Sequence, residues 1–222
     1  MDCKDRVRYD LQVVRFSYPL MLDISGRLAV IVGGGRVAAR KAGGLIAAGA
    51  ARLKVVAPEI CDAMPARVER IMESYSPSHL AGASLVFAAT NVAAVNAAVV
   101  RDAHELGLLV NRADGSDEDA GDFSTPALYR ERDLIMTVSA GGHPVIAAAI
   151  RDELKTHIDG RWLTMLDAVQ TLRPRALSEI SSEETRRSVF REMASREAME
   201  ILERQGVEAL WAWLLKRHVK NA

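Results

Sequence analysis

Short apolar runs alternate with longer helix-like stretches through the first half of the chain. Four runs have the length of a buried strand: RLAVIV (27–32), ARLKVVAP (51–58), SLVFAAT (84–90) and LLVNRAD (108–114). Between them lie two stretches of helical character, residues 36–49 and 92–107, and each ends at a glycine. Apolar strands separated by helices are typical of a parallel sheet that is covered on both faces. The pattern therefore predicts an α/β domain.

The alternation ends after Asp114. Residues 115–126 are acidic and rich in turn formers, and ALYRERDLIMTVSAGG (127–142) then predicts two strands in succession. Residues 144–158 have the pattern of a helix that begins with Pro144, a residue suited to the first helical position. This part of the chain predicts a small α+β segment.

Everything from Gly160 onward has helical character. Within it, residues 178–205 predict one charged amphipathic helix with an inner apolar stripe. Residues 1–17 are polar and precede the first strand as an N-terminal extension. We expect domain boundaries near residues 113 and 160.

The composition is that of a soluble globular protein without a charge bias. Of the 222 residues, 49% are hydrophobic and 26% are charged, and 29 basic residues balance 29 acidic ones. Proteins that bind nucleic acid or anionic membranes usually carry a basic excess, so we expect neither partner. Two cysteines are too few for a disulfide framework or a zinc site. With no signal-type segment and no uncharged run near the ~20 residues of a membrane helix, we expect a cytoplasmic protein.

Three consecutive glycines, Gly33, Gly34 and Gly35, join the first predicted strand to the first predicted helix. The spacing Gly33-x-Gly35-x-x-Ala38 fits the dinucleotide-binding pattern G-x-G-x-x-G/A, in the strand–turn–helix context that this pattern requires. Gly33 would permit the tight turn, Gly35 would leave room for the pyrophosphate, and Ala38 would let the helix pack closely on the strand. The alternative interpretation is a glycine turn of the kind found in any α/β fold, without nucleotide binding.

The start of this helix adds to the predicted cofactor site. The backbone N–H groups of Arg36, Val37 and Ala38 have no partner within the helix, and the helix dipole places a partial positive charge there. Both features attract phosphate groups. Together with the three glycines, these residues predict a Rossmann-type nucleotide site.

The end of the second predicted strand bears on the choice of cofactor. Dinucleotide folds usually place an acidic residue there to bind the adenosine ribose. Ala57 and Pro58 occupy that position here, and Glu59 just beyond them is either a ribose ligand or a surface glutamate. No arginine follows this strand to pair with a 2′-phosphate, which favours NAD over NADP.

Further motifs follow in a fixed order: FAATN, VNRADGSDEDAGDFSTPAL and TVSAGGHPVIAAAIRDEL. With the block GGGRVAARK, they resemble the precorrin-2 dehydrogenase / sirohydrochlorin ferrochelatase family of siroheme synthesis. The likeness runs from about Tyr18 to Ile158. It includes the elements N-x-x-D, F-x-x-P and S-x-G-G, which are more specific than the glycines alone.

The resemblance implies an oxidoreductase that removes two hydrogens from precorrin-2 with NAD and forms sirohydrochlorin. Some members also insert Fe²⁺ into the product, so a ferrochelatase activity is a second expectation. Members of the family are intertwined homodimers. Their NAD-binding Rossmann domain, dimerisation segment and helical domain correspond here to residues 18–113, 114–159 and 160–222.

Asp114 matches the family's proposed catalytic aspartate. It ends a predicted parallel strand, where the ligands of such sheets bind. An aspartate is ionised near neutral pH, so it could accept the proton that leaves precorrin-2, or pyrrole N–H protons as iron enters. From the residue type alone, a turn residue before Gly115 is the simpler interpretation.

Other residues are implied by the same resemblance. Thr90 and Asn91 would approach the nicotinamide ribose, although Asn91 also has the character of a helix N-cap. Asn111 and Arg112 flank the proposed active site, and Arg112 could face the polycarboxylate substrate.

A glycine-rich turn before residue 144 would contribute Ser139, Gly141, Gly142 and His143 to substrate binding. The family usually has S-x-G-G-x-S-P at this point. This chain lacks one residue of that element and has no serine before Pro144. His143 is therefore either a substrate contact or an exposed loop residue.

Two other functions are compatible with the pattern. One is an NAD-sensing regulatory module that binds the nucleotide without chemistry, which would need no carboxylate beside the nicotinamide. The other is a chelatase that has lost productive NAD binding, and the intact glycine pattern disfavours it.

Overall fold

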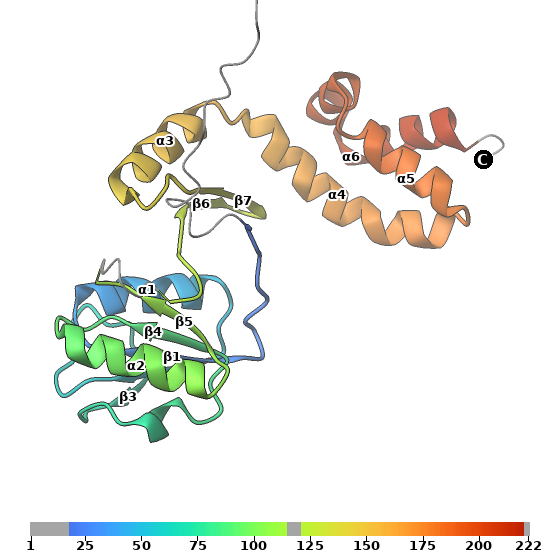
Figure 1. Cartoon of the computed structure of the whole chain (residues 1–222). Helices are drawn as coiled ribbons and strands as arrows, with labels where there is room; N and C mark the ends of the chain where they lie inside the picture. The colour runs from blue at the N-terminus through green and yellow to red at the C-terminus, as the bar shows by residue number, and fades with distance from the viewer. Residues whose placement is uncertain (1–17, 115–120, 220–222) are drawn as a thin grey trace, which may run out of the picture. The chain divides into compact units, whose positions relative to one another are not determined.

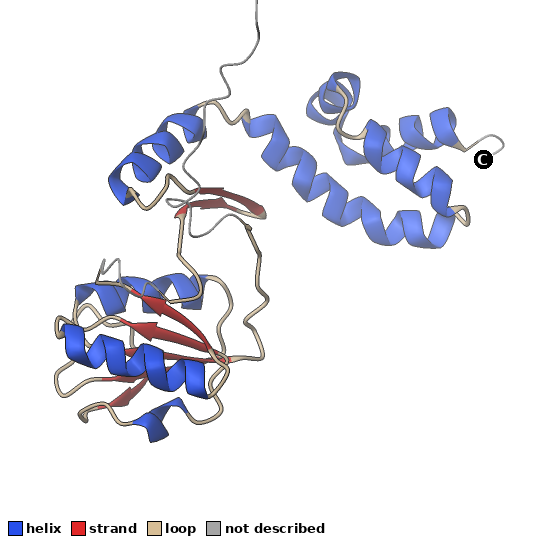
Figure 2. Ribbon diagram, in the orientation of Figure 1, coloured by secondary structure: helices blue, strands red, loops and turns tan. Residues whose placement is uncertain are grey.

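A computed structural model describes residues 18–114 and 121–219. The predicted N-terminal extension, residues 1–17, lies outside the described residues. The chain divides into two compact units, Met1–Thr125 and Pro126–Ala222. Figure 1 labels the elements of each unit, and Figure 2 shows that strands are concentrated in the first. The predicted boundaries near residues 113 and 160 differ from this division, and the three-domain description stays a prediction.

The first unit contains a five-stranded parallel sheet with the order β3-β2-β1-β4-β5. Its strands are β1 (Leu28–Val32), β2 (Arg52–Val56), β3 (Glu69–Ile71), β4 (Leu85–Ala88) and β5 (Leu109–Arg112). The helices are α1 (Arg36–Ala47) and α2 (Ala93–Glu105), with a short 3-10 helix, η1, at Pro77–Leu80. The predicted Rossmann-type sheet is confirmed.

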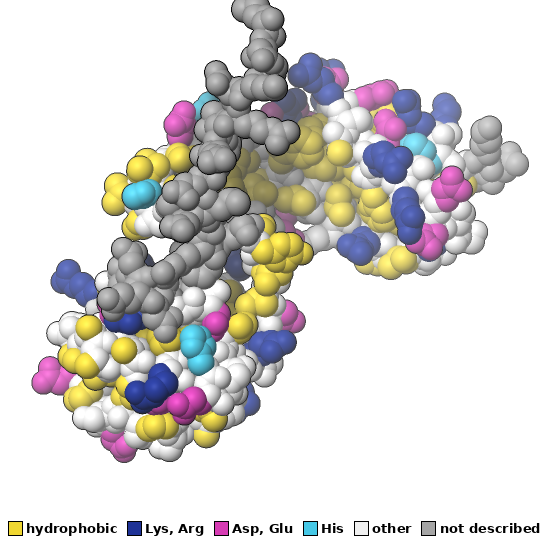
Figure 3. Space-filling view, viewed as in Figure 1, with side chains coloured by type: hydrophobic (Ala, Val, Ile, Leu, Met, Phe, Trp, Pro, Cys, Tyr) yellow, Lys and Arg dark blue, Asp and Glu magenta, His cyan; other side chains and the backbone are white. Residues whose placement is uncertain are grey.

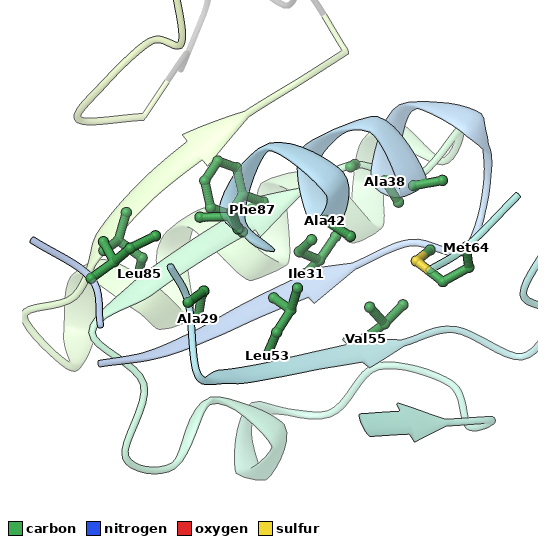
Figure 4. Close-up of a cluster of buried hydrophobic side chains, with 14 residues drawn as sticks. Ala29, Ile31, Ala38, Ala42, Leu53, Val55, Met64, Leu85 and Phe87 are labelled. Atoms are coloured by element: carbon green, nitrogen blue, oxygen red, sulfur yellow. The ribbon is translucent and has the colours of Figure 1, made fainter. Parts of the chain in front are cut away.

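The apolar strands are explained by helices on both faces of the sheet. Alternate residues of β1 face opposite sides: Ile31 packs with Ala38 and Ala42 of α1 (Figure 4), whereas Val30 packs with Val99 of α2. Ala38 and Ala42 are fully buried. Small side chains at these positions bring α1 close to the sheet, as the spacing of the glycine pattern predicted.

The strand β3 and the helix η1 do not follow from the hydrophobic pattern. The strand β3 is only three residues long. It lies at the edge of the sheet and pairs on one side with β2, and Glu69 and Arg70 are exposed there. Such a strand carries no apolar run to mark it. The helix η1 is held by His79, whose Nδ1 accepts a hydrogen bond from the Ser76 backbone N–H at 3.0 Å.

Beyond β5, the chain returns along the edge of the sheet. Gly121 forms an isolated antiparallel bridge with Asn111, and its φ of 78° lies in the region that favours glycine. A Cβ atom at Gly121 would also overlap the carbonyl oxygen of Val110. Phe123 then packs edge-on against Phe87, with the ring centroids 5.4 Å apart.

The second unit begins with a hairpin of β6 (Ala127–Glu131) and β7 (Leu134–Val138). The helix α3 (Pro144–Thr156) packs against both strands, as two strands followed by a helix predicted. Three more helices follow: α4 (Gly160–Glu179), α5 (Glu183–Glu192) and α6 (Arg196–His218). The predicted all-helical C-terminal part is confirmed.

The prediction of one continuous helix over residues 178–205 is wrong. The chain leaves the helix twice, and Ser182 and Ser195 begin α5 and α6. Each serine hydroxyl accepts a hydrogen bond from a backbone N–H of the first turn, from Thr185 and Ala198 respectively. Amphipathic periodicity continues across both breaks, so the hydrophobic pattern alone does not reveal them.

Trp211 anchors the core of this helical part. Its side chain is buried, and its indole N–H donates to Glu179 Oε2 at 2.9 Å. Trp162, in contrast, is 44% exposed.

Candidate functional site

The predicted cofactor and catalytic residues of the first unit meet at the carboxyl edge of the sheet. In the register of the adjacent strands β1, β4 and β5, Val32, Ala88 and Arg112 lie in one row. The glycine turn begins directly after Val32, and Thr90 and Asp114 lie two residues after Ala88 and Arg112. Ligands of open parallel sheets bind at this edge.

The three glycines have different roles in the turn. A Cβ atom at Gly33 would overlap the carbonyl oxygen of Ala89, and Gly33 has a φ of 131°. A Cβ atom at Gly34 would overlap the carbonyl oxygen of Glu59. At Gly35 it would meet nothing within 4 Å. Gly33 and Gly34 therefore permit the chain to pack against itself, whereas Gly35 leaves open space.

The start of α1 faces this open space without a side-chain cap. Gly35 is the N-cap, and its carbonyl oxygen accepts from Ala39 N at 3.0 Å. The first turn holds no acidic residue, and Arg36 and Val37 are exposed. Free N–H groups and the positive end of the helix dipole fit a pyrophosphate at this position. The residues present thus fit a dinucleotide.

Glu59 lies beside the glycine turn. The loop after β2 is fastened to the turn by a hydrogen bond of 2.9 Å from Cys61 N to the Gly34 carbonyl oxygen. The Glu59 side chain is exposed. Its role as a ribose ligand stays a prediction.

Asp114 is held by two neighbouring side chains. Arg112 Nε donates to its Oδ1 at 2.8 Å and to its Oδ2 at 3.0 Å, and Asn96 Nδ2 donates to Oδ2 at 2.9 Å. The side chains of Arg112 and Asp114 are 7% and 19% exposed. Hydrogen bonds from a cation and an amide stabilise the ionised carboxylate. Arg112 therefore forms an ion pair with Asp114 within the site.

Asn96 is the site residue that sequence reasoning missed. It lies on α2 and is fully buried. Its Oδ1 accepts from the Thr90 backbone N–H at 3.1 Å and from Thr90 Oγ1 at 2.8 Å. A sequence signal exists, because Asn96 is a polar residue on the otherwise apolar face formed by Val95, Val99 and Val100.

The interpretation of Asn91 as an N-cap is wrong. The N-cap of α2 is Val92, and Asn91 is exposed. Instead of an asparagine side chain, Thr90 Oγ1 accepts the Val92 backbone N–H at 3.1 Å. Thr90 rather than Asn91 accepts this hydrogen bond because its hydroxyl lies two residues before the backbone N–H of Val92.

Asn111 points away from Asp114, because neighbouring strand residues alternate between the two faces of the sheet. Its side chain is buried, and its Nδ2 donates to the Phe123 carbonyl oxygen at 2.7 Å. Its Oδ1 is buried without a hydrogen-bond partner among the described residues. Asn111 thus fastens the returning segment to β5. Its predicted contact with substrate stays a prediction.

The remaining predicted substrate residues belong to the second unit. Ser139, Gly141, Gly142 and His143 form the connection between β7 and α3, and all four are exposed. His143 is the N-cap of α3 without a side-chain cap, and its N–H donates to the Ala140 carbonyl oxygen at 2.9 Å. The uncapped start of α3 could accept an anionic group.

Known proteins resemble the chain in sequence and in structure. Residues 20–127 match a family described as "Putative NAD(P)-binding". Siroheme synthase 2 of Aeromonas salmonicida is 35% identical over 88% of this chain and 41% of its own length. The siroheme synthase of Chromobacterium violaceum is 40% identical over 64% of this chain and 31% of its own. The chain thus spans less than half the length of these curated relatives.

A solved structure shares the fold. The precorrin-2 dehydrogenase SirC superposes with a TM-score of 0.73 at 22% identity, covering 90% of this chain and all of that chain. The predicted combination of a Rossmann-type sheet and C-terminal helices is confirmed by this likeness. NAD as the cofactor of the first unit is supported by the matching nucleotide-binding family and by the glycine turn.

Proposed function

We propose that the chain belongs to the precorrin-2 dehydrogenase family and oxidises precorrin-2 to sirohydrochlorin with NAD, a proposal supported by its likeness to siroheme synthases in sequence and to SirC in fold. The observation that carries this proposal is the placement of the Asp114 carboxylate, which accepts hydrogen bonds from Arg112 and Asn96, at the same sheet edge as the open glycine turn. A nucleotide sensor would need the turn but not the carboxylate. The network around Asp114 therefore favours catalysis over the NAD-sensing alternative.

NAD bound at the glycine turn would supply the acceptor for the hydride that leaves the tetrapyrrole. Asp114 accepts the proton that leaves with it, so the substrate loses two electrons and two hydrogens. Arg112 and Asn96 stabilise the ionised state in which Asp114 can take that proton. The open space at Gly35 and the start of α1 would hold the pyrophosphate.

Insertion of Fe²⁺ into sirohydrochlorin is the second part of the proposal. The pyrrole nitrogens would hold the incoming ion, and their protons would need a base. Asp114 can serve both steps because each is a proton transfer from the same tetrapyrrole. Fe²⁺ is thus a substrate, and the site requires no set of protein ligands for it.

We propose a cytoplasmic homodimer with a small-molecule substrate and no nucleic-acid or membrane partner. Among the described residues, no helix is both long and apolar enough to cross a membrane. The helix α3 exposes Val145, Ile146, Ile150 and Leu154, which are between 40% and 80% exposed. Figure 3 shows hydrophobic side chains gathered over this helix. An exposed apolar face of this kind is typical of an interface.

The test is an assay of precorrin-2 with NAD, with and without Fe²⁺, followed by absorbance. Asp114→Asn keeps the shape of the side chain but removes the base. We expect dehydrogenation to fall by ~10²–10⁴-fold, as for loss of a positioned base, with NAD affinity unchanged. Iron insertion should fall as well if the same base serves it.

The control is Asp133→Asn in the exposed turn between β6 and β7, which should behave like the parent. An Asp114→Asn variant with the parent rate would return Asp114 to a role as a turn residue. A parent protein that binds NAD but never oxidises precorrin-2 would support the sensor alternative.

A further inference from the structure

Asn96 uses every hydrogen-bonding group of its side chain. An asparagine amide has two N–H donors and two acceptor positions on oxygen. Oδ1 accepts from Thr90 N and Thr90 Oγ1, and Nδ2 donates to the Thr90 carbonyl oxygen at 3.0 Å and to Asp114 Oδ2 at 2.9 Å. The side chain is fully buried. It therefore links the ends of β4 and β5 through one rigid planar group.

The orientation of this amide is set by its neighbours. The backbone N–H of Thr90 can only donate, so the atom that faces it must be the amide oxygen. The amide nitrogen must then face the Thr90 carbonyl and Asp114. It follows that Asp114 Oδ2 is an acceptor in this contact, and that its position depends on Thr90.

We propose that Asn96 is a positioning residue for the reaction: it fixes the carboxylate of Asp114 and ties it to the strand end at Thr90. The inference rests on the proposed role of Asp114 as the base. Thr90 is also the residue expected beside the nicotinamide ribose. Asn96 thus sets the distance between the proton acceptor and the hydride acceptor, which must act on the same substrate.

The charged surroundings of Asp114 make its hydrogen bond with Asn96 sensitive to substitution. Arg112 of β5 supplies the positive charge beside the carboxylate, and α2 supplies the neutral amide of Asn96. Arg101 and Asp102, further along α2, form a separate network with Tyr75. Because Asn96 Nδ2 contacts Asp114 Oδ2 directly, a negative charge introduced at position 96 would face the Asp114 carboxylate.

Asn96→Asp tests the inference with little change in shape. One carboxyl oxygen still accepts from Thr90, while the donor to Asp114 becomes a second carboxyl group. We expect kcat at neutral pH to fall by about 10²-fold, the effect of a small misplacement of a reacting group, with the KM for NAD unchanged. Because two facing carboxyl groups share a proton, activity should recover partly as the pH rises, whereas the parent should not show this recovery.

A matched control lies on the same helix. Asp102 is also buried on α2, and it accepts a hydrogen bond from Tyr75 Oη at 3.0 Å. Asp102→Asn changes a buried polar group of α2 without touching Asp114. This variant should keep the parent kcat and pH profile even if its unfolding midpoint falls.

A second readout needs neither cofactor nor substrate. The carboxyl ¹³C resonance of Asp114 can be followed against pH in the free protein, and Asn96→Asp should move its midpoint to higher pH. A variant with the parent midpoint and the parent kcat would overturn the inference. If Asp114→Asn is inactive in that case, the base assignment survives and only the positioning role falls. If Asp114→Asn is as active as the parent, the proposed mechanism falls together with this inference.

Discussion

At the scale of one residue, a side chain introduced at Gly35 should affect cofactor binding but not folding. Its φ of −84° suits any side chain, and a Cβ atom there meets nothing within 4 Å. Aspartate is moreover a favourable N-cap. We expect Gly35→Asp to keep or raise the thermal unfolding midpoint, while NAD binding measured by calorimetry is lost, because a charged side chain fills the pyrophosphate position.

Gly34→Ala is the contrasting variant. Its Cβ atom would overlap the carbonyl oxygen of Glu59, so this substitution should lower the unfolding midpoint. Normal NAD affinity in Gly35→Asp would show that the nucleotide site lies elsewhere.

Lys41 gives the first unit a pH-dependent stability. Burial, with a smaller contribution from repulsion by Arg40, lowers the pKa of Lys41 to about 8 from 10.5. Its ammonium group lies 5.6 Å from the centroid of the Phe87 ring and donates to Thr125 Oγ1. Between the two pKa values, the unfolded chain binds more protons at this lysine than the folded protein does. The Lys41 contribution to the free energy of unfolding should therefore rise with pH from about pH 8 towards 10.5.

Lys41→Met keeps the apolar stem and removes the titrating group. Denaturant unfolding across this pH range should show a shallower rise in stability for the variant than for the parent. Lys155→Met, at an exposed position of α3, is the control and should follow the parent. Identical pH slopes for Lys41→Met and the parent would contradict the expectation.

At the scale of the element, α3 carries the predicted interface. Val145 and Ile146 are 80% and 53% exposed although they belong to an otherwise apolar helix face. We expect the parent to scatter light as a dimer, at twice its chain mass of 24.2 kDa. The double variant Val145→Glu and Ile146→Glu should be monomeric, because two charges would have to be buried at the interface.

Leu177→Glu is the control for this experiment, since Leu177 of α4 is exposed to a similar degree, 63%. It should leave the dimer intact. A parent protein that is monomeric at micromolar concentration would refute the proposed dimer, and a dimer that persists in the double variant would remove α3 from its interface.

At the scale of the whole molecule, the order of elements was predictable because each unit buries its apolar residues in a regular pattern. Fully apolar strands such as β1 and β4 indicate a sheet covered on both faces, and the observed helices cover both. Three features escaped prediction: the edge strand β3, the helix η1 and the breaks before α5 and α6. In these places local hydrogen bonds and short length, rather than hydrophobic periodicity, decide the structure.

The sequence by itself determined the Rossmann-type sheet, the open glycine turn and Asp114 at a strand end, because these follow from local pattern and from the parallel direction of the strands. Only the tertiary structure showed that Gly34 packs against Glu59, that Arg112 pairs with Asp114, and that Asn111 donates to the Phe123 carbonyl oxygen of the returning segment. Asn96 is 18 residues from Asp114 in the chain and reaches it only because α2 packs against β4 and β5. Such contacts depend on how segments far apart in the chain pack together, and a single sequence does not show directly which of their residues meet.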